Sequence, residues 1–122
     1  MNLPSLKKVL IQKYSFLATT DELGNNNLIL LTATGIISGK AIQDVPEDQD
    51  LSSDDVMSKI SLEIAKQYRA DNGIGDDESL TGNDGFICLK DVQIISGTKT
   101  INLPFLTVFY DEVIATTLGN IS

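Results

Sequence analysis

Two strand-like stretches of this chain are separated by a long segment that has few apolar side chains to bury. Residues 28–42, LILLTATGIISGKAI, are rich in apolar and β-branched types, and residues 86–95, FICLKDVQII, form a second such run. A strand needs a neighbour to satisfy its backbone N–H and C=O groups. We therefore predict that residues 86–95 pair with residues 36–43, and that the segment between them is looped out of the sheet.

The looped-out segment carries almost all of the negative charge. Residues 44–84 hold twelve acidic and three basic side chains, a balance of −9, whereas the rest of the chain holds five acidic and six basic side chains, a balance of +1. An acidic face repels phosphate backbones, so this composition argues against nonspecific nucleic-acid binding. The sequence thus predicts a local acidic insertion in an otherwise nearly neutral domain.

The N-terminal segment predicts a first helix, which Ser5 caps and which runs to about Leu17. Its apolar positions recur at spacings of three and four, as expected for one buried face. Lys7, Lys8 and Lys13 lie mostly off that stripe and form the only basic cluster; we expect a solvated face, with contact to an acidic partner or a neighbouring subunit's insertion as the alternative. The stripe consists of Leu6, Val9, Leu10, Tyr14 and Leu17.

A second helix is predicted over residues 53–71, inside the acidic insertion. Ser52 and Asp55 resemble a capping box at its start, and Gly73 provides a C-terminal stop. Its apolar stripe indicates docking on the rest of the domain or, alternatively, on a partner. The stripe consists of Val56, Met57, Ile60, Ile64 and Tyr68.

The C-terminal third predicts three strands: residues 86–95, residues 100–110 after an SGTK turn, and a last segment, VIATTLG. Pro104 has no amide hydrogen, so its strand is an edge or contains a bulge there. Gly35 and Gly39 likewise indicate a bulge, a bend or a close backbone approach in residues 28–42.

These elements favour a single α+β domain, mainly β, in which five short, bent strands close a small barrel and so cover their own edges. An N-terminal helix packs on the barrel, and the helix-bearing acidic insertion separates strands two and three. A chain of 122 residues is the size of one domain. We divide it into residues 1–43, the insertion 44–84, and residues 85–122.

Two segments carry a resemblance to the Sm-like family, which includes the bacterial host-factor RNA chaperones. ICLKDV, residues 87–92, resembles the third strand, and LTVFYDEVIAT, residues 106–116, resembles strands four and five with their tight connection. Tyr110, Ile114 and Thr116 coincide with the chaperone's strand junction. Gly35 and Gly39 are similar to the two glycines of the first Sm motif, although they stand one residue closer together. The resemblance implies an Sm-like or SH3-like small barrel.

The same junction departs from the family where RNA is bound. Asp111 and Glu112 occupy the positions of a lysine and a histidine, and carboxylates repel a polyanion within the screening length of about 8 Å. The RNA-contacting residues therefore do not carry over. We interpret Asp111 and Glu112 as partner-facing, and a divergent Sm-like RNA-binding protein remains the alternative.

From the residue types that usually take part in catalysis or cofactor binding, we predict neither a catalytic centre nor a cofactor. The chain has no histidine, and its single cysteine, Cys88, lies in an apolar run and is expected in the core. The acidic loop offers oxygen ligands for a hard cation, but the order of an EF-hand is missing, so we expect a solvated loop rather than a metal site. The weak metal candidates are Asp71, Asp76, Asp77 and Glu78.

We expect a non-catalytic module that self-associates through residues 100–118, as a dimer or a ring, because LPFLTVFY is more apolar than one small barrel can hide. A protein partner for the insertion or its helix, and an enzyme that uses carboxylates of the insertion, are further alternatives. With neither a signal-peptide pattern nor a long apolar segment, the chain is expected in the cytoplasm and not in a membrane. The interface candidates are Leu103, Phe105, Val108, Tyr110 and Ile114.

Overall fold

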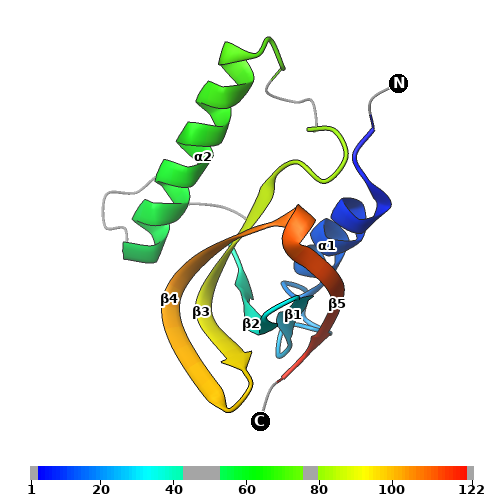
Figure 1. The fold of residues 1–122 in the computed structure, drawn as a ribbon, viewed down its shortest axis with the longest axis vertical. Coiled ribbons are helices and arrows are strands. Elements are labelled where there is room, and N and C mark those ends of the chain that lie inside the picture. The colour runs from blue at the N-terminus through cyan, green and yellow to red at the C-terminus, as the bar shows by residue number, and fades with distance from the viewer. Residues whose placement is uncertain (1–2, 43–52, 76–79, 121–122) are drawn as a thin grey trace.

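The computed structural model describes residues 3–42, 53–75 and 80–120 and contains one antiparallel five-stranded sheet with two helices (Figure 1). The mainly-β, α+β class is therefore confirmed. In chain order the elements are α1 (Leu6–Leu17), β1 (Asn27–Thr32), β2 (Gly35–Ala41), α2 (Ser53–Asp71), β3 (Phe86–Ser96), β4 (Lys99–Phe109), the 3-10 turn η1 (Tyr110–Glu112) and β5 (Val113–Gly119).

The pairing predicted across the acidic segment is confirmed. The strand order is β4-β3-β2-β1-β5, and β2 pairs with β3 in antiparallel register from Ile36 opposite Ile95 to Ala41 opposite Leu89. The chain between these strands carries α2, which lies outside the curved sheet (Figure 1). The proposed cap Ser52 lies outside the described residues.

The sheet is open, so the expected closure into a barrel is wrong for the described residues. β4 and β5 are the two ends of the strand order. The three residues of η1 turn the chain after β4, and β5 then pairs with β1, placing Leu118 opposite Leu28. Within the described parts of the chain, each end strand consequently has one edge without a ladder partner.

Pro104 meets the first of the two conditions predicted for it, an end strand, whereas the β3–β4 register is unshifted around it. It lies in β4, an end strand, and the β3–β4 ladder passes from Lys90–Phe105 to Val92–Leu103 without pairing Pro104. The skipped residue of β3 is Asp91, which has a positive φ of 52°. That conformation bends β3 at Asp91. Because Pro104 has no ladder partner there, its missing N–H costs the ladder no hydrogen bond.

Gly39 of β2 lies beside the same irregular part of β3, on the side opposite β4. The β2–β3 register shifts between Ser38 and Lys40, and a Cβ added to Gly39 would lie 3.2 Å from both Leu89 Cβ and Lys90 O. The glycine therefore permits close approach of β2 to the bend in β3, as its position in the sequence indicated.

The core lies between α1 and one face of the sheet, and the face of α1 that packs there differs from the predicted one. Lys8, Ile11 and Ser15 are buried, whereas Leu6 and Leu10 of the predicted stripe are 75% and 41% exposed. Ile11 is the centre of the packed face, because residues three before and four after it share its side of a helix. The fully buried apolar side chains are Ile11, Leu28, Leu30, Leu89, Val92 and Val113.

The docking of α2 through its apolar stripe on this domain is also wrong. All five stripe residues are exposed, from Val56 at 42% to Ile64 at 65%, while Ser58 on another side of the helix is 1% exposed. The helix contacts β4. Within the described residues, neither helix combines the length and the apolar character needed to cross a membrane.

Candidate functional site

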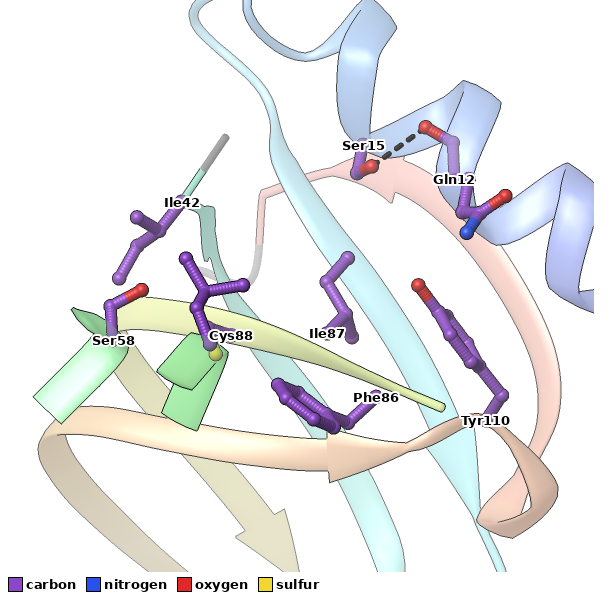
Figure 2. Close-up of a pocket in the computed structure, with 9 residues that line it drawn as sticks. Gln12, Ser15, Ile42, Ser58, Phe86, Ile87, Cys88 and Tyr110 are labelled. Carbon is purple, nitrogen blue, oxygen red and sulfur yellow. Dashed lines mark hydrogen bonds between the residues drawn. The ribbon is translucent and has the colours of Figure 1, made fainter. Parts of the chain in front are cut away.

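A cavity of about 300 Å³ lies between α1, α2 and the start of β3 (Figure 2). The described residues that line it are polar or apolar, and none of them is acidic or basic. Hydrogen-bonding groups come from both helices and from η1, and β3 supplies the apolar floor. The lining residues are Gln12, Ser15, Ile42, Ser58, Leu62, Phe86, Ile87, Cys88 and Tyr110.

Tyr110 is the largest polar side chain in this cavity. It is 5% exposed, its main-chain N–H donates to Gly85 O at 3.2 Å, and Figure 2 shows its hydroxyl directed toward α1 near Gln12. Burial raises the pKa of the Tyr110 hydroxyl, opposed by a hydrogen bond with Gln12 and reinforced by Cys88. The phenol is therefore neutral at physiological pH and can donate or accept a hydrogen bond.

Cys88 is a core residue, as expected from the sequence. Its thiol is buried and free, and Sγ lies 4.0 Å from Thr107 Oγ1. A reactive thiol needs a base or a neighbouring cation to form a thiolate. None of the residues lining this cavity supplies one. The described lining residues can hold a small molecule by hydrogen bonds and apolar contact, and none of them would activate the thiol.

A second cavity, of about 150 Å³, adjoins the first, and the two share Gln12, Leu62, Phe86 and Tyr110. It differs in charge, because Lys8 of α1 and Arg69 of α2 both line it. Leu80, Ala65 and Gly85 complete its wall. We call it the cationic cavity.

Lys8 is nearly inaccessible, with 3% of its surface exposed. Its Nζ donates to Leu80 O at 2.8 Å and lies 5.7 Å from the centroid of the Tyr110 ring. The pKa of Lys8 is lowered, first by burial and second by the positive charge of Arg69, while Asp84 acts in the opposite direction. Two cations therefore share this cavity at an electrostatic cost.

Arg69 contributes an atom without a partner. Its Nε is the one buried side-chain nitrogen or oxygen in the described parts of the chain that has no hydrogen-bond partner. Buried donors are nearly always satisfied, and each exception calls for an explanation.

A third hollow, of about 370 Å³, runs between α1 and β5. Leu6, Leu10 and Tyr14 line it from α1, and Ile114 and Thr116 line it from β5. Lys7 bridges the same two elements, since its Nζ donates to Val113 O at 2.8 Å. We call this hollow the α1–β5 groove.

The predicted solvated lysine face is therefore wrong for two of the three lysines. Lys8 is buried and Lys7 is bonded to the main chain of β5, whereas Lys13 is exposed. A long lysine side chain can bury its methylenes when its ammonium reaches a carbonyl oxygen. The signal available in the sequence was the position of Lys8 three residues before Ile11, on the same helical face.

The five predicted interface residues occupy different environments. Val108 and Tyr110, both 5% exposed, belong to the core. Leu103 and Phe105 are partly buried, and Ile114 is 69% exposed. Tyr110 instead lines both cavities, which the sequence did not indicate.

The acidic candidates lie apart from these cavities. Asp111 and Glu112 are exposed on η1. Asp71 is exposed near the end of α2, where its carboxylate accepts a hydrogen bond from Gln67 Nε2 at 2.8 Å, and Asp76, Asp77 and Glu78 lie outside the described residues. Among the residues that are described, no three His, Cys, Asp or Glu side chains gather as metal ligands.

Comparison with known proteins found no match to any family model, any curated protein or any solved structure.

Proposed function

We propose that this protein is a non-catalytic interaction module, built on a small Sm-like sheet, that self-associates by pairing the free edges of β4 and β5 between copies. The observation that carries this proposal is the pair of unpaired strand edges at the two ends of one curved sheet. An exposed edge presents a row of N–H and C=O groups that another strand can complete.

The composition of these edges favours pairing. Proteins that keep their sheet edges free usually place charges or prolines along them. β5 contains neither, and β4 has only Lys99 at its start and Pro104 near its middle. Pairing is therefore easiest along β5 and along the part of β4 that follows Pro104.

Exposed apolar side chains lie on both end strands. Phe109 of β4 is 55% exposed and Ile114 of β5 is 69% exposed. The α1–β5 groove adds Leu6, which is 75% exposed, next to Ile114. Apolar surface that is continuous with an open edge is typical of a protein–protein interface.

The Sm-like assignment is supported by the order of the elements. An N-terminal helix precedes five bent strands, and η1 forms a tight connection between β4 and β5. The tight connection belongs to residues 106–116, one of the two segments that carry the resemblance. The exposed carboxylates of Asp111 and Glu112 at that connection favour a protein partner over a nucleic acid.

A charge placed on the β5 edge is expected to abolish self-association. We expect wild-type protein to sediment as a dimer or larger species, and the Ile114→Lys variant to sediment as a monomer, because pairing would bury an unpaired ammonium. Sedimentation equilibrium over a range of protein concentrations measures this directly.

The matched control is Ile64→Lys, which makes the same exchange at a position of similar exposure, 65%, on α2. We expect this variant to associate like the wild type. A monomeric wild-type protein, or dissociation caused by Ile64→Lys but not by Ile114→Lys, would contradict edge pairing.

A further inference from the structure

We propose that the cationic cavity binds a small oxyanion, the phosphate or carboxylate group of a small molecule, between Lys8 and Arg69. This site is independent of the strand edges and of the proposed self-association. Lys8 comes from α1 and Arg69 from α2, so the ligand would join the insertion to the N-terminal helix.

Charge is the first reason for this inference. Lys8 is 3% exposed and shares the cavity with a second cation. Removing a charge from water is costly unless an opposite charge compensates it, and breaking such compensation is strongly destabilising. Among the described residues, Asp84, which is exposed, is the acidic group that acts on Lys8, and its effect on the pKa of Lys8 is smaller than that of Arg69. Within this part of the chain the two cations that line the cavity therefore lack a matching negative charge, which a bound anion would supply.

Hydrogen-bond donors are the second reason. Arg69 Nε has no partner among the described residues, and an ammonium has three hydrogens, of which Lys8 uses one for Leu80 O. The Tyr110 hydroxyl and the Gln12 amide line the same cavity. A guanidinium edge and an ammonium are the groups that proteins use to hold carboxylate and phosphate oxygens.

Size decides how much of a ligand fits. A cavity of about 150 Å³ is smaller than a typical small-molecule site, which spans roughly 300–1,000 Å³. It suits the anionic group alone. The described residues that line the adjoining cavity of about 300 Å³, including Ser58, Gln12 and Phe86, carry no charge, so this cavity can take the neutral body of the same molecule.

Binding of inorganic phosphate, measured by isothermal titration calorimetry at constant ionic strength, tests the site. We expect saturable binding to the wild-type protein and a Kd at least about tenfold higher for Arg69→Gln, since the substitution removes charge-assisted hydrogen bonds to the anion. The matched control is Lys66→Gln, which removes one positive charge from an exposed position on the same helix. Its Kd should equal that of the wild type.

Acetate and glycerol phosphate, titrated in parallel, identify the group and the role of the neighbouring cavity. Arg69-dependent binding of phosphate or of acetate supports the site and names the anion. Tighter binding of glycerol phosphate than of inorganic phosphate supports use of the uncharged cavity. The proposal is overturned if neither anion saturates the wild-type protein, or if Lys66→Gln weakens binding as much as Arg69→Gln does.

Discussion

Leu30→Ala is expected to lower the free energy of unfolding by about 2–5 kcal/mol, the usual cost of truncating a fully buried leucine. Leu30 is 0% exposed at the centre of β1, where it lies opposite Ile37 on one side and Thr116 on the other. The substitution removes apolar contacts and leaves a cavity between α1 and the sheet. Urea denaturation followed by circular dichroism measures the change.

Leu31→Ala is the matched control for this experiment. Leu31 is the next residue of the same strand and is 39% exposed, because successive side chains of a strand point to opposite faces. We expect it to cost less than about 1 kcal/mol, as substitutions outside the core usually do. A larger loss for Leu31→Ala than for Leu30→Ala would mean that β1 is shifted by one residue.

Gly35→Ala is expected to destabilise the protein by about 1–3 kcal/mol or more, as overpacking does when the neighbour is main chain. A Cβ at Gly35 would lie 2.4 Å from Ile95 O, the carbonyl of the facing strand β3. The methyl group can be accommodated only if β2 and β3 separate at this end. The same urea titration measures the effect.

Gly119→Ala is the control for the general effect of adding a methyl group to a glycine in this sheet. There the added Cβ would meet only Ile29 Cδ1, at 3.4 Å, the end of a side chain that can move. We expect a change within about 0.5 kcal/mol. Equal stability of Gly35→Ala and Gly119→Ala would show that β2 does not approach β3 as closely as described.

The strands and helices could be predicted because their signals are local. Ser5 caps α1 through its side chain, which accepts a hydrogen bond from the Lys8 N–H at 3.0 Å, and both glycines of residues 28–42 lie where β2 approaches β3 closely. Apolar runs separated by turn residues then located β3, β4 and β5, whereas residues 28–42 fitted either two strands or one long bent strand and form β1 and β2. The pairing of β2 with β3 followed because strands adjacent along the chain commonly pair.

The buried face of α1 was mispredicted because the assignment relied on apolarity alone. Lys8 occupies a core-facing position. Its ammonium donates a hydrogen bond to the main-chain oxygen of Leu80, a residue that is remote in the sequence. The stripe led by Leu6 and Leu10 instead lines the α1–β5 groove. Helical periodicity locates an apolar side, but the tertiary partner decides which neighbouring positions become inaccessible.

Closure of the sheet could not be predicted because it is a long-range property. The number of strands and their bends follow from local residues, namely Pro104, Gly39 and the turn residues. Closure instead depends on whether β4 pairs with β5. In the structure, η1 directs β5 to β1 instead. The exposed edges that result are the basis of the proposed function.

The cationic cavity was also beyond prediction, since its two charged residues come from helices far apart in the chain. α2 places Ser58, not its apolar stripe, against the domain, and this orientation brings Arg69 to the cavity that Lys8 lines. Pattern reasoning predicted the opposite side of α2 to be buried. A site between an insertion and its host domain depends on which side of the inserted helix packs against that domain.

Amide hydrogen exchange followed by NMR tests most directly whether one sheet of residues 27–41 and 86–119 is the scaffold and α2 lies outside it. We predict the slowest exchange for amides in β1, β2 and β3, the three strands with ladder partners on both sides, and markedly faster exchange for α2, whose apolar stripe is exposed. Slowest exchange in α2, with unprotected amides in β2 and β3, would contradict this architecture.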